Sequence, residues 1–375
     1  MPVSAPKSRS GGPAGPTRLA DILDVTALDA ALAEGHVRAQ RHPDHPMSIY
    51  NYTEACTYGQ YWTPVTLACR GLIVDDATGT VLARPFAKFF NHEQPGAPTL
   101  RLDAPVTVTD KADGSLGIIY PDPDGTFAVA TRGSFASDQA RHATAVLRNR
   151  YAHFVPPTGL TVLVEVVYPA NRIVLDYRGL DDLVLLGAVE IATGRTHGPE
   201  AVPGWPGPTV EQFGYATLAE ALAAPPRDNR EGLVVHCRET DQRVKIKYAE
   251  YLRLHRLVTG LTARAVWDVL VNGGDLAALV EPLPDEFHIW VRDVVATLTE
   301  TVEDRAAKIE TAYREIVAVL PEGWSRREFA QAVHGHPERA CLFLHLDGKD
   351  YRPLLWQHAR PSADWTPHHP DTDAP

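Results

Sequence analysis

Alternating apolar and polar positions dominate the chain between Gly71 and Tyr248. Runs rich in β-branched residues are separated there by Gly, Asp and Pro turns, which is typical of antiparallel strands. Ala77-Thr78-Gly79 and Pro121–Gly125 each lie between two such runs and predict hairpins. Helical spacing is present at Asp21–Ala33 and Ser137–Arg150. The pattern predicts one mixed domain built on antiparallel sheets with flanking helices.

Helical periodicity replaces this alternation after Tyr251. It recurs in Leu252–Val271, Glu286–Val319 and Arg326–Val333, which predicts a separate, small all-helical domain. Both ends of the chain are polar and rich in Pro, a composition that is typical of disorder. The sequence therefore predicts an α+β protein in four parts: a disordered leader at 1–17, a sheet-rich domain at 18–251, a helical C-terminal domain at 252–360 and a disordered tail at 361–375.

Composition narrows the class of protein. The 375 residues are 44% hydrophobic and 22% charged, which is typical of a globular protein of two domains. No apolar run is long enough to cross a bilayer, and the leader lacks the apolar stretch of a signal peptide. The four cysteines are widely scattered and show no zinc or disulfide spacing. We expect a cytoplasmic protein with reduced thiols and no membrane partner.

The net charge of −11 bears on possible partners. Phosphate contacts dominate the affinity of nucleic-acid binders, many of which are basic. The acidic total therefore argues against a protein that coats nucleic acid without sequence preference. It allows an enzyme that binds a few phosphates with a local cluster of cations.

The segment Lys111-Ala112-Asp113-Gly114-Ser115 is the first candidate for chemistry. It lies between two predicted strands, Val106–Thr109 and Leu116–Tyr120. The structural alternative is a simple turn, because Asp-Gly favours hairpins. Three further features follow along the chain and weigh against that alternative.

Glu165 lies inside the apolar run Thr161–Tyr168, where a carboxylate is costly unless it is paired or faces a wet cleft. Glu231-Gly232 precedes another apolar strand. Alternation places Lys245 and Lys247 on one face of a third strand. Each feature alone could be a solvated edge or face. A groove that binds phosphates would need the same arrangement.

The ordered set Lys-x-Asp-Gly, apolar strand with Glu, Glu-Gly and Lys-x-Lys resembles the motifs of the covalent nucleotidyltransferases, which include DNA ligases, RNA ligases and capping enzymes. Finer details resemble the phage tRNA-repair RNA ligases. These are Arg70-Gly71-Leu72-Ile73-Val74, Lys88-Phe89-Phe90-Asn91, Thr131-Arg132-Gly133-Ser134 and Pro169-Ala170-Asn171-Arg172-Ile173-Val174-Leu175. The resemblance runs from about Arg70 to Tyr248 and identifies 18–251 as an adenylyltransferase domain.

The resemblance implies an ATP-dependent RNA ligase. Lys111 would form a covalent lysyl–AMP, AMP would pass to an RNA 5′-phosphate, and an RNA 3′-hydroxyl would then displace it. Mg²⁺ or Mn²⁺ would bind the ATP phosphates, with Glu231 as the protein residue that orients a metal-bound water. Nicked tRNA would be the substrate, and a kinase or phosphatase that heals the RNA ends would be a partner.

The resemblance also implies the roles of the remaining residues. Phe90 would stack on adenine, and Glu165 would hold the ribose hydroxyls. Arg70, Lys88 and Arg132 would contact phosphates. The nucleotide-binding set is completed by Asp113, Gly114, Lys245 and Lys247. Lys245 and Lys247 are expected to neutralise the triphosphate and to lower the pKa of Lys111 towards a nucleophilic amine. Asn171 and Arg172 are expected to fix a loop and are left out of the site.

Three alternatives remain. A DNA ligase or capping guanylyltransferase usually carries an OB-fold after the last motif, whereas the sequence there is helical. A catalytically silent RNA- or nucleotide-binding relative would be favoured by a missing lysine, but Lys111 is present. A metal-dependent hydrolase is disfavoured because the histidines show no ligand spacing, and His42 and His45 lie in a predicted loop at 41–46 without a matching carboxylate or cysteine set.

Overall fold

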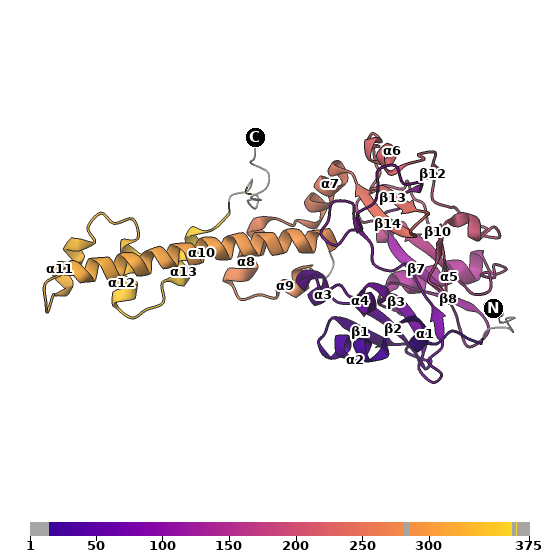
Figure 1. The fold of residues 1–375 in the computed structure, drawn as a ribbon, viewed down its shortest axis with the longest axis horizontal. Coiled ribbons are helices and arrows are strands. Elements are labelled where there is room, and N and C mark those ends of the chain that lie inside the picture. The colour runs from indigo at the N-terminus through magenta and orange to yellow at the C-terminus, as the bar shows by residue number, and fades with distance from the viewer. Residues whose placement is uncertain (1–14, 281–284, 362–364, 366–375) are drawn as a thin grey trace, which may run out of the picture. The chain divides into compact units, whose positions relative to one another are not determined.

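The computed structural model describes residues 15–280, 285–361 and 365 (Figure 1). The predicted leader and tail lie largely outside this part of the chain. The described chain divides into two compact units, Met1–Val258 and Thr259–Pro375. The first is built on sheets and the second is helical, so the predicted α+β class is confirmed.

The first unit begins with a four-stranded antiparallel sheet in the order β1-β2-β3-β4. Its strands are β1 (Val37–Arg41), β2 (Met47–Tyr52), β3 (Arg70–Asp75) and β4 (Val81–Ala83), and its helices are α1 (Leu19–Ile22), α2 (Val25–Ala33), α3 (Glu54–Gly59) and α4 (Pro64–Ala68). The prediction of one helix over Asp21–Ala33 is wrong. Asp24 accepts hydrogen bonds from the N–H groups of Thr26 and Ala27 and starts a second helix there.

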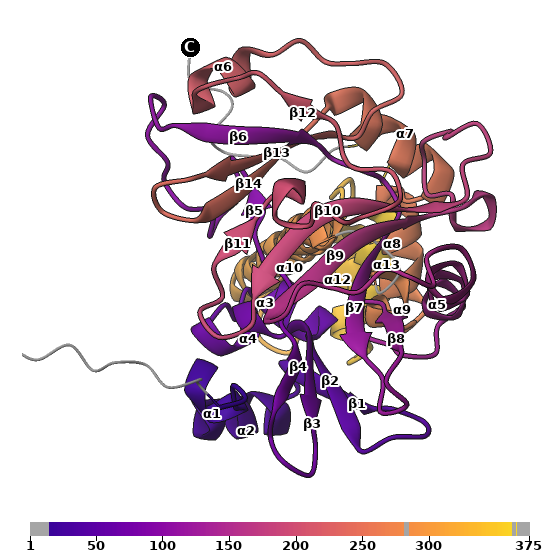
Figure 2. The same cartoon turned by 90° about the vertical axis from the view of Figure 1, so that its right-hand side faces the viewer.

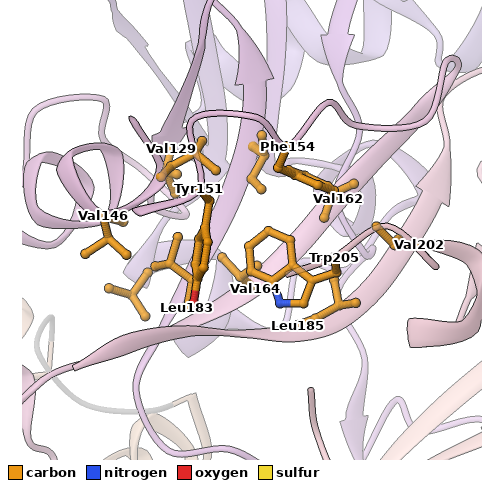
Figure 3. Close-up of a cluster of buried hydrophobic side chains, with 14 of the residues drawn as sticks. Val129, Val146, Tyr151, Phe154, Val162, Val164, Leu183, Leu185, Val202 and Trp205 are labelled. Carbon is orange, nitrogen blue, oxygen red and sulfur yellow. The ribbon is translucent and has the colours of Figure 1, made fainter. Parts of the chain in front are cut away.

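The second sheet has the order β11-β10-β9-β7-β8. Its members are β7 (Ser115–Pro121), β8 (Phe127–Ala130), β9 (Leu160–Val167), β10 (Asp182–Glu190) and β11 (Thr196–His197). The helix α5 (Asp138–Arg150) packs on β8 and β10, and Ser137 caps its first turn. Figure 3 shows part of the core beneath it, where the Trp205 ring lies 4.9 Å from that of Phe154.

The third sheet has the order β12-β6-β13-β14-β5. Its strands are β5 (Phe90–Asn91), β6 (Val106–Asp110), β12 (Gln212–Phe213), β13 (Gly232–Cys237) and β14 (Gln242–Lys247), with α6 (Leu218–Ala223) and α7 (Ala249–Thr259) beside them. Short 3₁₀ turns occupy Pro169–Asn171 and Pro199–Ala201. Within the first unit, β6, β13 and β14 lie on one side of β9 and β10, and the first sheet lies on the other (Figure 2).

Both predicted hairpins are confirmed, as β3–β4 and β7–β8.

The second unit contains α8 (Ala263–Val271), α9 (Leu276–Val280), α10 (Asp285–Val319), α11 (Arg326–Ala332), α12 (Arg339–Leu346) and α13 (Arg352–His358). Side chains of α10 to α13 share one core around Phe329 and Leu355. A search of the described helices finds none with the length and hydropathy needed to span a bilayer.

Candidate active site

The predicted nucleophile lies where the second and third sheets meet. Lys111 follows β6 directly, and its N–H donates to the carbonyl of Gly232 in β13 (3.0 Å). Gly114 precedes β7, and its N–H donates to Oε1 of Glu165 in β9 (3.1 Å). A Cβ at Gly114 would lie 2.5 Å from the Val166 carbonyl oxygen, so this close approach of two strands requires glycine.

One carboxylate oxygen joins the two lysines of this site. Oε1 of Glu231 lies 2.6 Å from Nζ of Lys111 and 2.9 Å from Nζ of Lys247. The side chains of Glu231 and Lys247 are 3% and 4% exposed, whereas that of Lys111 is 19% exposed. Lys111 is therefore the member of this trio that a ligand can reach most easily.

Burial alone would lower the pKa of Lys111, but the negative charges of Glu231 and Glu165 outweigh it and leave the pKa raised. Burial lowers the pKa of Lys247. Burial opposes ionisation of Glu231, but its two lysine partners hold its pKa below the usual range. The expectation that neighbouring cations lower the pKa of Lys111 is wrong, because the carboxylates of Glu231 and Glu165 have the larger effect and Lys111 is paired with Glu231.

Three carboxyl groups lie near Lys111. Those of Asp113, Glu165 and Glu231 interact electrostatically with Lys111, and those of Glu231 and Asp113 also interact with Lys247. Burial raises the pKa of Glu165 to about 7, with Glu231 and Asp113 acting in the same direction against Lys111.

The described residues contain no group of three or more His, Cys, Asp or Glu that could hold a metal. The disfavoured alternative of a metal site at His42 and His45 gains no support from the fold, since Nδ1 of His42 accepts hydrogen bonds from two backbone N–H groups.

The raised pKa of Glu165 makes a prediction about stability. The folded protein holds this proton up to about pH 7, whereas the unfolded chain releases it near 4.5. The free energy of unfolding should therefore fall as pH rises between these values, by at most about 3 kcal/mol. Glu165→Gln keeps the hydrogen-bond acceptor and removes the titration. We expect thermal melts of the two proteins to agree near pH 5 and the variant to be more stable at pH 8. Parallel curves across this range would contradict the assignment.

Asp113 forms hydrogen bonds to other buried groups of the protein. Its Oδ2 accepts hydrogen bonds from the N–H groups of Val174 and Leu175 (3.1 and 3.0 Å), and its Oδ1 accepts from the Tyr251 hydroxyl (2.7 Å). Its own N–H donates to the Tyr177 hydroxyl (2.7 Å). Asp113 is 4% exposed. The nucleotide contact expected for Asp113 stays a prediction, while the contacts present fix the loop that carries Lys111.

We predict that Tyr251→Phe destabilises this loop. The change leaves Oδ1 of Asp113 buried without its donor, which should cost about 1.5–3 kcal/mol because the acceptor is charged. Thermal melting would show the loss of stability, and the rate of AMP attachment should fall with it. Tyr61→Phe is the matched control, since Tyr61 is 52% exposed. Equal stability of the two variants would argue against the bond to Asp113.

Two further groups of predicted residues gather around aromatic rings. Nζ of Lys88 lies 5.2 to 5.6 Å from the ring centres of Phe90, Trp62 and Tyr52. Nη1 of Arg132 donates to the Tyr52 hydroxyl (3.0 Å). Tyr52 and Trp62 were not singled out in the sequence, because an aromatic residue in a strand or turn usually serves only the core.

Two cationic side chains lie near the Phe89 ring. The Arg70 guanidinium and Nζ of Lys245 lie 5.6 and 5.1 Å from its ring centre. Phe90 is only 4% exposed and packs near Gly96, so little of its ring is open to a base. Its proposed stacking on adenine stays a prediction. Asn171 donates to the Ser115 hydroxyl and the Val166 carbonyl (3.1 and 2.8 Å), so it does fix the loop after β9.

Known proteins resemble this chain in sequence. The RNA ligase family model matches residues 68–251. An RNA ligase of Rhodothermus phage RM378 is 22% identical over 80% of this chain and 85% of its own length. A protein of Autographa californica nuclear polyhedrosis virus, whose name proposes a bifunctional polynucleotide kinase/RNA ligase, is 26% identical over 59% of this chain and 35% of its own length.

Among solved structures, an archaeal ATP-dependent RNA ligase is 15% identical and covers 87% of this chain and 96% of its own, with a TM-score of 0.41. A similarity at this level adds nothing to the assignment. The sequence matches carry it, because the matched segment contains the whole Lys111 site and the phage relative aligns along most of both chains. Residues 68–251 therefore belong to the RNA ligase family, and the chain is an ATP-dependent RNA ligase.

Proposed function

We propose that this ligase joins an RNA 3′-hydroxyl to an RNA 5′-phosphate through a lysyl–AMP intermediate on Lys111. The bridge from Lys111 through Glu231 to Lys247 is the observation that carries the proposal. Lys111 is the most exposed of the three side chains and lies at the end of a strand, where its position is fixed by the Gly232 carbonyl.

In the first step, Nζ of Lys111 forms a bond to the α-phosphorus of ATP, and the bond to the diphosphate leaving group breaks. Nζ must lose a proton before or during this attack. Its pairing with Glu231 opposes that loss, so the lysine stays inactive until the carboxylate finds another partner. Lys247 is held in place to neutralise charge on the phosphates.

A divalent cation fits this site. Asp113, Glu165 and Glu231 place three carboxyl groups near Lys111, and the two lysine partners of Glu231 hold its pKa below the usual range, so this carboxylate is ionised and can act as an anionic ligand. Glu231 would hold the ion together with nucleotide phosphates and water, as Mg²⁺ often requires few protein oxygens. When bound, Mg²⁺ or Mn²⁺ supplies charge stabilisation at the phosphates. Drawing Glu231 away from Lys111 would also favour the neutral amine.

The natural substrate proposed is RNA broken in a single-stranded loop, such as nicked tRNA. RNA recognition often targets such loops, and the helical second unit is available to contact the rest of the RNA. The viral relative's name joins a kinase to a ligase, which supports an end-healing kinase or phosphatase as partner. The cytoplasm is the proposed location, because the four cysteines are buried thiols that form no disulfide.

The test is incubation with α-labelled ATP and Mg²⁺, followed by intact mass measurement. We expect one covalent AMP, which diphosphate or 5′-phosphorylated RNA removes. Transfer to RNA should exceed transfer to DNA of the same sequence. A protein that binds ATP but gains no mass would sink the proposed mechanism, and preferred transfer to DNA would sink the substrate assignment.

A further inference from the structure

Three cations follow one face of β14. Arg243, Lys245 and Lys247 alternate with residues of the opposite face, and they pair across the sheet with His236, Val234 and Gly232 of β13. Lys247 lies beside the nucleophile, and Lys245 lies beside Phe89. Arg243 is the far end of the row. Successive members are about 6.8 Å apart along the strand, a spacing suited to successive phosphates of an extended nucleic-acid strand.

Arg243 has few partners for a buried cation. Its side chain is 8% exposed, and burial lowers its pKa to about 10. Among the described residues it makes one side-chain hydrogen bond, to the Thr196 hydroxyl. The nearest Asp241 oxygen is 3.7 Å away, too far for a hydrogen bond, and is already bonded to His236 at 2.7 Å. A guanidinium carries five N–H donors, so this arrangement leaves capacity for an anionic ligand.

A cavity of about 390 Å³ lies in front of this guanidinium. Its walls include Arg243, its neighbours Asp241 and Gln242, Thr196, and the aromatic residues Phe86 and Phe89. The Arg243 guanidinium lies 4.5 Å from the Phe86 ring centre. A cation beside aromatic rings is the combination that binds single-stranded nucleic acid, by phosphate contact and by stacking.

The cavity adjoins the expected nucleotide site, because Lys88 and Phe90, which are expected to contact ATP, also line it. None of Lys111, Glu165, Glu231 and Lys247 lines it. Phe89 lines the cavity, and its ring also lies near Lys245 and Arg70. Only this ring would therefore separate a ligand in the cavity from the cations that are expected to bind phosphates. After diphosphate has left, Lys245 and Lys247 can contact the phosphates of a second substrate.

We propose that this face of β14 and its cavity bind the RNA strand that carries the 5′-phosphate. Arg243 contacts a phosphate downstream of the reacting end, and the partly exposed Phe89 ring lies beside the attached nucleotide. This inference rests on the proposed function, because it assigns the second substrate of the same enzyme. It concerns RNA binding and AMP transfer to RNA, and it leaves the attack of Lys111 on ATP to the residues already described.

Arg243→Gln tests the proposal. With enzyme already carrying AMP, we expect the affinity for a 5′-phosphorylated single-stranded RNA oligonucleotide to fall about ten- to a hundredfold, since a charge-assisted contact is lost. The salt dependence should lose about 0.7 from its logarithmic slope, as expected for one phosphate contact to a single strand. Single-turnover transfer of AMP to the RNA at subsaturating concentration should fall in parallel, while formation of lysyl–AMP continues.

Gln242→Glu is a second test of the cavity, which remains available if Arg243→Gln fails to fold. Gln242 is exposed and lines the cavity, so a carboxylate there should repel RNA without disturbing the core. Arg238→Gln is the matched control, because Arg238 is an exposed arginine between the same two strands that does not line the cavity. Its RNA affinity should equal that of the wild type.

Unchanged RNA affinity in both cavity variants would overturn the inference, and so would an equal loss of affinity in Arg238→Gln. A loss of lysyl–AMP formation equal to the loss of RNA transfer would also overturn it, because the cavity would then serve ATP or the fold. Wild-type protein that never gains AMP would instead refute the proposed function. The RNA affinities can be compared without AMP, so the two failures are distinguishable.

Discussion

Lys111→Ala is expected to reduce covalent AMP attachment to the background of the assay. The change removes the only atom proposed to bond to the α-phosphorus. The fold should survive, because Glu231 keeps Lys247 as a partner at 2.9 Å and the Lys111 side chain is not fully buried. Intact mass measurement after incubation with ATP and Mg²⁺ checks the result. Circular dichroism and a thermal melt verify that the variant is folded.

A second substrate separates attachment from later chemistry in this variant. RNA that is already adenylylated at its 5′ end needs no lysyl–AMP, so Lys111→Ala should still seal it at a measurable rate. Retained AMP attachment to the folded variant would remove Lys111 from its proposed role. Failure with ATP together with sealing of adenylylated RNA would place the defect at the first step.

Glu231→Ala is expected to slow lysine adenylylation about a hundredfold or more, a typical loss for one preorganised electrostatic contact. ATP affinity should change little, because most of the nucleotide contacts are assigned elsewhere. The sign of the effect is informative. Glu231 raises the pKa of Lys111, so its removal alone should leave more neutral amine and speed the attack at neutral pH.

A slower reaction would therefore mean that Glu231 speeds lysine adenylylation through the metal by more than its ion pair with Lys111 slows it. Single-turnover rates across pH 6 to 9 and across Mg²⁺ concentrations would measure both effects. We expect the variant to need more Mg²⁺ and to reach half its maximal rate at lower pH. An unchanged rate and an unchanged Mg²⁺ dependence would exclude Glu231 from the metal role. Glu211→Ala is a control, since Glu211 is an exposed carboxylate outside the site.

Much of the fold, and the position of Lys111 at the end of a strand, could be predicted from local sequence. The hairpin at β3–β4 follows from alternation around Ala77-Thr78-Gly79, because strand pairing of neighbours leaves a short-range pattern. Lys111 stands out because a strand, a lysine and an Asp-Gly turn are consecutive. The structure brings Lys111, Glu231 and Lys247 within direct contact, although their roles in catalysis stay predictions.

Other parts of the site leave no local pattern. Tyr251 bonds to Asp113 across 138 positions of the chain, and Tyr177 does so across 64. The direction of the Lys111 pKa shift was also out of reach, since it depends on which buried charge is nearest, and a count of neighbouring lysines along the chain cannot supply that. Asp24 was overlooked as a helix start because an Asp within a helical pattern looks like one more polar position.

The hydrogen bonds of Asp113 restrict which amino acid can occupy this position of the motif. Both oxygens of this carboxylate are occupied by Val174, Leu175 and Tyr251, and its N–H by Tyr177. A different side chain at position 113 would have to satisfy three partners at once, Val174, Leu175 and Tyr251, all of which lie 61 or more positions away in the sequence. The identity of this position is thus fixed by joint constraint, and homologues that vary it should show compensating variation at Tyr251. Covariation between these two positions would be a genetic trace of the loop that carries Lys111.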